Sequence, residues 1–203
     1  MLDFSNSKIL IVGDVMLDKY YFGKVDRISP EAPVPIVNIQ KEESRLGGAS
    51  NVANNIVSLG GHSLLCGVIG HDLFGKEIER ISRHKNIDTF LLKTSSPTIT
   101  KARIIGGKQQ IVRVDYEDKS ELNADNKKLF RDTISRILPE YDILVISDYG
   151  KGLISEDLCR YLIKLAHKYD KKVIIDPKGK NWEKYSGADI VTPNVKELND
   201  IVG

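Results

Sequence analysis

Two adjacent glycines, Gly47 and Gly48, stand directly before a short segment in which apolar residues recur at helical spacing. Without side chains, they let a ligand approach the bare backbone, and the start of the following helix presents unpaired N–H groups. Asn51 lies one turn further on and carries an amide that both donates and accepts hydrogen bonds, which suits a sugar hydroxyl. The stretch therefore indicates a polyol site. An ordinary glycine-rich loop before a core helix is the alternative.

Two carboxylates, Asp14 and Asp18, follow an apolar run at residues 8–12 that is typical of a strand buried on both faces of a parallel sheet. Because ligands bind at the carboxyl ends of such strands, these acids could hold a nucleotide ribose, a metal or a sugar. A role as turn residues is the alternative for both. The chain has no G-x-G-x-x-G pattern, which argues against a dinucleotide-binding oxidoreductase.

Three later apolar runs also end in polar or glycine-containing turns. These turns contain Ser147-Asp148, Asp176-Pro177-Lys178 and Pro193-Asn194. In a doubly wound sheet such strand ends share one edge, so we expect a single cleft lined by carboxylates, an amide, a lysine and a helix N-terminus. This set suits a polyol that carries phosphate and indicates phosphoryl transfer. Asn194 and Glu197 also match a helix-capping pair, which by itself explains their spacing.

The segments that must position these residues alternate between apolar strands and amphipathic helices, which predicts an α/β fold with a mostly parallel central sheet flanked by helices. Two stretches interrupt the alternation. Residues 26–41 contain three prolines, which exclude a helix and a central strand and favour an edge strand in a small lid or a dimer contact. Residues 99–105 and 110–115 predict a β-hairpin in the same small sheet.

On the predicted hairpin, Lys101 and Arg103 lie two residues apart and therefore face the same side of the sheet. That side could hold an anionic group of a substrate. A solvated strand face is the alternative for both residues, and it carries more weight for Lys101 than for Arg103.

The bulk properties bound the function further. The 203 residues are 41% hydrophobic and 29% charged, and their net charge of +2 gives no electrostatic case for binding nucleic acid or a membrane surface. The N-terminus lacks a secretion signal and no apolar run reaches membrane-spanning length, so we expect a cytoplasmic protein. Cys66 and Cys159 are expected to be buried thiols, and the four histidines show no metal-ligand spacing.

Several of these stretches together resemble the PfkB/ribokinase family of carbohydrate kinases. Gly47-Gly48-Ala49-Ser50-Asn51-Val52-Ala53 is similar to the first signature of the family, and Pro193-Asn194-Val195-Lys196-Glu197 to its N-x-x-E motif near the nucleotide phosphates and Mg²⁺. Within the family, four other stretches resemble the kinases that act on a heptose 7-phosphate. These stretches are residues 12–18, 27–35, 147–152 and 175–179.

The resemblance covers essentially the whole chain and implies a ribokinase-like fold over residues 1–203, with lid segments at about 20–43 and 97–117. It implies that ATP, with Mg²⁺, phosphorylates the anomeric hydroxyl of D-glycero-β-D-manno-heptose 7-phosphate to give the 1,7-bisphosphate, a step toward ADP-heptose for lipopolysaccharide cores. Another sugar or nucleoside kinase of the family is the alternative. Members are usually homodimers in which the lid sheet helps to form the interface.

The resemblance also assigns roles to residues. Asp18, Gly48 and Asn51 are expected to bind the sugar hydroxyls. From its charge and lid position, Arg103 is our own candidate for the 7-phosphate. The full expected substrate set is Asp14, Asp18, Gly47, Gly48, Asn51, Arg103, Asp148 and Lys178. The expected ATP and Mg²⁺ set is Asn194, Val195, Lys196 and Glu197, with no direct metal ligand.

One departure from the family concerns catalysis. Its members continue into a G-A-G-D motif whose glycines form an anion hole and whose aspartate deprotonates the sugar hydroxyl. The 203 residues up to Gly203 contain neither that motif nor the adenine-binding segment. We therefore expect the general-base aspartate beyond Gly203, no catalytic residue within the chain and no activity from the chain alone. A non-catalytic sugar-phosphate-binding or assembly module is a further alternative.

Overall fold

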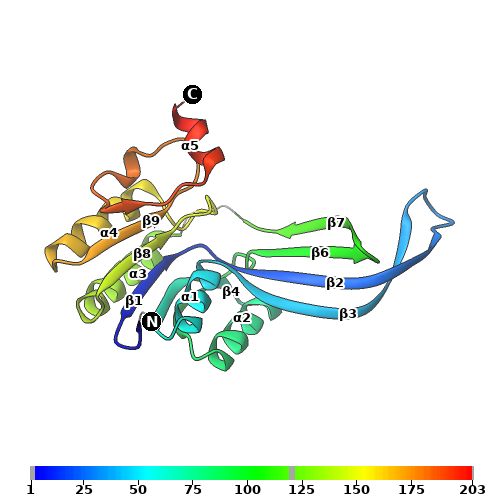
Figure 1. Cartoon of the computed structure of the whole chain (residues 1–203), viewed down its shortest axis with the longest axis horizontal. Coiled ribbons are helices and arrows are strands. Elements are labelled where there is room, and N and C mark those ends of the chain that lie inside the picture. The colour runs from blue at the N-terminus through cyan, green and yellow to red at the C-terminus, as the bar shows by residue number, and fades with distance from the viewer. Residues whose placement is uncertain (1–2, 119–121, 203) are drawn as a thin grey trace.

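The computed structural model describes residues 3–118 and 122–202 and contains two sheets (Figure 1). The larger sheet has six strands in the order β10-β9-β8-β1-β4-β5, and neighbouring strands run parallel. Its strands are β1 (Lys8–Gly13), β4 (His62–Gly70), β5 (Asp88–Thr94), β8 (Ile143–Ser147), β9 (Lys172–Asp176) and β10 (Ile190–Val191). The parallel order confirms the predicted central sheet.

Helices cover both faces of this sheet because its strands are apolar on both sides. Side chains alternate along β1, so Leu10 and Val12 join the core under one pair of helices, whereas Ile11 joins the core under the other pair. The first pair is α3 (Ala124–Ile137) and α4 (Glu156–Lys168), and the second is α1 (Ala49–Ser58) and α2 (Leu73–His84). The result is the three-layer α/β architecture expected from the sequence.

Polar side chains fix where these helices begin. Asp72, Asn123 and Ser155 each accept a hydrogen bond from a backbone N–H in the first turn of α2, α3 and α4 respectively. The chain also forms α5 (Val195–Val202) and two 3₁₀ turns, η1 (Leu138–Glu140) and η2 (Glu183–Tyr185). None of the helices described is long and apolar enough to cross a membrane.

The second sheet has four strands in the order β3-β2-β6-β7 and projects from the three-layer body (Figure 1). Its strands are β2 (Val15–Ile28), β3 (Pro35–Gly48), β6 (Thr100–Gly106) and β7 (Gln109–Tyr116). Strand β3 lies at an edge and β6 pairs with β7 as a hairpin, which confirms both sequence expectations for this sheet. Strands β2 and β3 extend beyond the expected lid segment 20–43, because only Asp14 separates β1 from β2 and because β3 continues to the start of α1.

Both cysteines are buried, as the sequence predicted. Cys66 and Cys159 are free thiols in the core, and burial raises the pKa of each well above its ordinary value. Neither thiol is therefore set up as a nucleophile.

Candidate functional site

The polar turns predicted from the sequence do meet at one edge of the central sheet. Strands β1, β8 and β9 are parallel neighbours, and their last residues Gly13, Ser147 and Asp176 are in register across the three strands. The turns after these strands therefore lie side by side at the carboxyl edge, where ligands bind in open α/β sheets. Strand β10 pairs with β9 and adds the turn that leads into α5.

The two glycines before α1 make room for neighbouring protein atoms. A Cβ on Gly47 would lie 2.5 Å from Asp18 Oδ2, and a Cβ on Gly48 would lie 2.4 Å from the carbonyl oxygen of Asp14. Gly48 also has φ of +54°, a region that side chains disfavour. The amide of Ala49 donates to that same Asp14 oxygen at 3.0 Å. One N–H at the start of the helix is therefore already bonded, and the glycines serve close packing around both aspartates.

Asp18 lies on β2 and not in a turn, so the turn interpretation is wrong for this residue. Its Oδ1 accepts from Arg103 Nη1 on the neighbouring strand β6 at 2.5 Å, and both side chains are about one-fifth exposed. The Tyr20 ring, next on the same face, lies 5.2 Å from Arg103 Cζ and 4.8 Å from Arg45 Cζ. The predicted sugar ligand and the predicted phosphate ligand are thus ion-paired to each other.

Lys101 lies on the same face of the second sheet as Asp18, and its side chain extends toward the turn after β8. Its Nζ lies 5.9 Å from the centre of the Tyr149 ring, which follows β8. This contact brings one face of the second sheet over the turns at the strand ends. Asn51 is exposed on the first turn of α1, three residues after Gly48.

Asp14 is buried between the two sheets and holds the turn that follows β8. Its Oδ2 accepts from the backbone amides of Tyr149 at 2.8 Å and Lys151 at 3.1 Å. Its Oδ1 is buried and has no hydrogen-bond partner among the described residues. Burial is the main reason that the pKa of Asp14 is raised, in spite of those two amides. Asp14 therefore positions the turn, and its role toward substrate stays a prediction.

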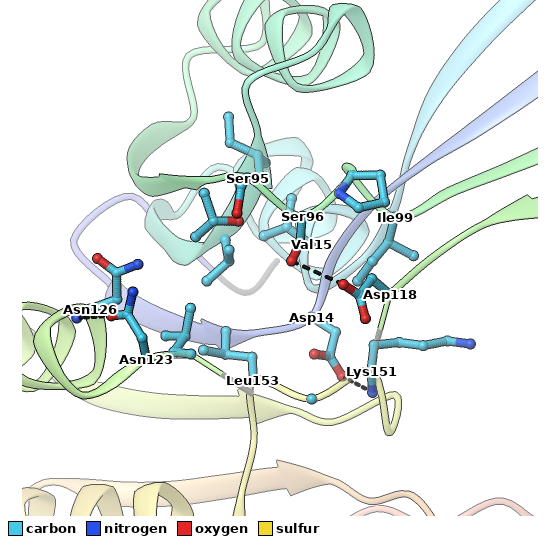
Figure 2. Close-up of a pocket in the computed structure, with 16 residues that line it drawn as sticks. Asp14, Val15, Ser95, Ser96, Ile99, Asp118, Asn123, Asn126, Lys151 and Leu153 are labelled. Carbon is cyan, nitrogen blue, oxygen red and sulfur yellow. Dashed lines mark hydrogen bonds between the residues drawn. The ribbon is translucent and has the colours of Figure 1, made fainter. Parts of the chain in front are cut away.

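Asp14 also lines a pocket of about 220 Å³ beneath the connections to the second sheet (Figure 2). Ser95 and Ser96 approach from the end of β5, Asn123 and Asn126 from the start of α3, and Figure 2 shows the Asp14 carboxylate bonded to the Lys151 backbone. This pocket is separate from the face that carries Asp18, Lys101 and Arg103.

The Asp148 carboxylate also bonds to other groups of the protein. It is 1% exposed at its side chain, and its Oδ2 accepts from the Tyr185 hydroxyl at 2.8 Å and forms an ion pair with Lys184. Its Oδ1 accepts from the amide of Gly150 at 2.7 Å. Both carboxylate oxygens are occupied, so in this arrangement Asp148 orders the strand-end turns. Tyr185 extends the link, because its hydroxyl accepts from the Lys178 amide at 2.9 Å.

Lys178 lies with the residues expected on the nucleotide side and apart from Asp18. Its Nζ is 2.9 Å from Glu197 Oε1. Glu197 Oε2 accepts from the Asn194 amide at 3.0 Å, and Asn194 Oδ1 accepts from the Glu197 amide at 2.9 Å, which confirms the capping pair. Val195 and Lys196 are exposed in the first turn of α5. Burial, and then the charge of Glu197, raise the pKa of nearby Asp176.

The expected general base is not among the residues that the structure describes. We expect that aspartate beyond Gly203, and Gly203 itself lies outside the described residues, which end at Val202. The ribokinase-like fold expected over residues 1–203 also includes residues 1, 2 and 119–121, which lie outside the described residues. The position of the base, and the expectation of no catalytic residue within the chain, therefore stay predictions.

The sequence did not single out several residues that shape this site. Tyr149 and Lys151 lie within the quoted 147–152 stretch, but nothing in their types showed that their amides would bond Asp14. Lys184 and Tyr185 have no local signal, because they meet Asp148 from more than thirty residues away. Asp176 follows an apolar run in the sequence, but only the structure brings it near Glu197.

Comparison with known proteins assigns the chain to one family. The model of the pfkB family carbohydrate kinases matches residues 6–203, and the chain belongs to that family. A Helicobacter pylori (strain P12) protein named bifunctional protein HldE is 48% identical over 193 residues, which are 94% of this chain and 42% of that protein. A Bordetella bronchiseptica protein named D-beta-D-heptose 7-phosphate kinase is 44% identical over 200 residues, which are 98% of this chain and 63% of that protein. The chain thus spans less than two thirds of either relative.

Solved structures agree on the fold. Phosphofructokinase-2 from Escherichia coli superposes with a TM-score of 0.74 at 21% identity, covering 97% of this chain and 64% of that one. A carbohydrate kinase from Agrobacterium tumefaciens has a TM-score of 0.71 at 17% identity, with coverages of 97% and 64%. At these identities the likeness establishes the ribokinase-like fold.

Proposed function

We propose that this chain supplies the sugar-binding side of an ATP-dependent kinase that phosphorylates the anomeric hydroxyl of D-glycero-β-D-manno-heptose 7-phosphate. The product would be the 1,7-bisphosphate, on the route to ADP-heptose and the lipopolysaccharide core. The observation that carries the proposal is the Asp18 carboxylate, seated against Gly47 and among cations on the sheet face that overlooks the strand ends. The 44% identity to a protein named as a heptose 7-phosphate kinase supports the choice of sugar.

In this proposal different residues bind different parts of the acceptor sugar. Asp18 accepts hydrogen bonds from sugar hydroxyls, Asn51 contributes its amide, and Gly48 allows the sugar close to the backbone. The cations on the same sheet face attract the phosphate of the sugar. Asp14 and Asp148 keep the strand-end turns in place beneath the sugar.

ATP and Mg²⁺ belong on the other side of the cleft. The carboxylates of Asp176 and Glu197 are close enough for Glu197 to raise the pKa of Asp176, and their oxygens could hold Mg²⁺ through its bound water. When bound, Mg²⁺ neutralises charge on the phosphates during transfer. Lys178, with Asn194 and Glu197 at the start of α5, would face those phosphates.

The proposal extends to assembly, location and activity. We expect a homodimer through the second sheet, where β7 exposes Ile111, Val112 and Val114 along its length. Because ATP is the phosphate donor, the cytoplasm is the expected compartment. The 203-residue chain alone is expected to release no ADP, since it contains no G-A-G-D aspartate to act as general base.

Thermal melts of the 203-residue chain test the sugar assignment. Heptose 7-phosphate at a hundredfold over its Kd should add about 2.7 kcal/mol, or very roughly 5–10 °C, whereas fructose 6-phosphate should add little. A shift with fructose 6-phosphate alone would favour another sugar kinase of the family. A cooperative melt that neither sugar raises would contradict the proposed function.

A further inference from the structure

The cations on the face of the second sheet that carries Asp18 are not equivalent. Arg103 is paired with Asp18 at 2.5 Å, Arg113 with Asp115 at 2.8 Å, and Arg45 with Glu43 at 2.7 Å. Lys151, from the turn after β8, is paired with Glu117. Lys101 is half-buried, and among the described residues it has no carboxylate within ion-pair distance.

The pairing of side chains, and not the register of the strands, leaves Lys101 without a direct carboxylate partner among the described residues. Asp18, Lys101 and Asp115 are in register on β2, β6 and β7, so Lys101 has a carboxylate in the row on either side. Each carboxylate nevertheless bonds the arginine one same-face position further along, Asp18 with Arg103 and Asp115 with Arg113. The bidentate guanidinium of Arg113, which gives Asp115 two hydrogen bonds, holds that carboxylate better than a lysine would.

The surroundings of Lys101 favour an anion. Its ammonium lies near the Tyr149 ring. Burial and then the charge of Lys151 lower the pKa of Lys101, and they outweigh the charges of Asp18 and Asp115, which act in the opposite direction. A half-buried cation beside another cation is costly until an anion joins it. A phosphate dianion would give Lys101 the direct ion pair that neither neighbouring carboxylate makes with it, and a lysine ammonium binds phosphate well as a point charge.

Resting on the proposed function, we propose that Lys101, and not Arg103, is the residue that binds the phosphate already carried by the acceptor sugar. Arg103 acts through Asp18 as a positioning residue, holding the carboxylate that meets the sugar hydroxyls. Lys101 thereby sets the preference for a phosphorylated sugar over the same sugar without its phosphate. This reverses the weight that the sequence alone placed on the two residues.

The test compares binding of heptose 7-phosphate and of unphosphorylated heptose by calorimetry, using the wild-type chain and three variants. Lys101→Gln should weaken heptose 7-phosphate binding by about 10- to 100-fold and leave the unphosphorylated heptose within about twofold. Arg103→Gln should weaken both sugars by similar factors. Lys108→Gln, at the exposed tip of the same hairpin, is the matched control and should change neither.

The outcomes separate the two proposals. If the wild-type chain binds neither sugar, the proposed function fails. If it binds heptose 7-phosphate and Lys101→Gln binds it equally well, or loses both sugars alike, the assignment of Lys101 is overturned and the function stands. Lys101→Arg, which keeps the charge, should retain most of the preference, and ligand-free melts of all variants show that each is folded.

Discussion

Asp18 and Arg103 are joined by an ion pair across β2 and β6, with Nη1 and Oδ1 2.5 Å apart. The pair links the two residues that the sequence had assigned to different parts of one ligand. Because both side chains are partly exposed, the pair contributes little to stability, and its main effect is to orient the carboxylate. Under the proposed function, the Asp18 carboxylate is therefore oriented before a sugar binds.

Replacing the carboxylate should separate binding from folding. Asp18→Asn removes the charge that pairs with Arg103 and one strong acceptor for sugar hydroxyls, so we expect about a 10- to 100-fold weaker Kd for heptose 7-phosphate. The melting temperature without ligand should change by no more than a few degrees. Calorimetric titration measures the first and a melt the second. Asp26→Asn, at an exposed position of the same strand, should bind normally. An unchanged Kd in Asp18→Asn would remove Asp18 from the site.

Alanine substitutions at the two adjacent glycines should affect different properties, sugar binding at Gly47 and stability at Gly48. Gly47→Ala places a methyl 2.5 Å from the Asp18 carboxylate, which can rotate aside, so sugar binding should fall more than stability. Gly48→Ala meets the Asp14 carbonyl at 2.4 Å in a backbone region with φ of +54°, so we expect a loss of about 1–3 kcal/mol in unfolding free energy. Urea denaturation and sugar titration of both variants would show the contrast. Equal loss of stability in the two would contradict it.

Asp14 should make the protein less stable as pH rises. Burial raises its folded pKa above the ordinary value of 3.8, so the protonated form is favoured in the folded state. Its contribution is complete below pH 3.8 and is lost as the pH rises through the raised folded pKa. Asp14→Asn keeps an oxygen for the Tyr149 and Lys151 amides and places its NH₂ where Oδ1 has no described partner.

We therefore expect the melting temperature of Asp14→Asn, relative to that of the wild type, to increase as the pH is raised from about 4 to 7. Asp14→Ala, which leaves the two amides unbonded, should melt lower than the wild type throughout. Melts of the three proteins at each pH supply the measurement. A difference between Asn and Asp that stays constant with pH would show that the Asp14 charge carries no cost.

The buried pair of Asp148 and Lys184 should be a point of weakness for folding. Lys184→Met leaves the Asp148 carboxylate buried without its cation, which should cost about 3–5 kcal/mol of unfolding free energy. Adding Asp148→Asn should restore part of that loss, because the uncompensated charge is removed. Lys180→Met, at an exposed position in the same connection, is the control. Simple additivity of the two changes in denaturant melts would argue against coupling.

The sequence by itself determined the fold and the edge of the sheet at which the polar turns meet. Apolar runs such as residues 8–12 are typical of strands buried on both faces of a parallel sheet that helices cover. The order of strands and helices therefore predicts the architecture. The polar residues at the strand ends then had to share one edge. The Asn194–Glu197 capping pair was also predictable, because capping depends on neighbours within three residues.

Only the tertiary structure decided what each polar side chain does. Asp14 and Asp148 looked like ligands in sequence, but they bond to turns and side chains far along the chain. Lys101 and Arg103 looked alike on one strand. The register places Asp18 and Asp115 beside Lys101, but the folded side chains pair these carboxylates with Arg103 and Arg113 and leave Lys101 without an ion pair among the described residues. Local spacing determines which way a residue faces, whereas its partners come from strands that only folding brings together.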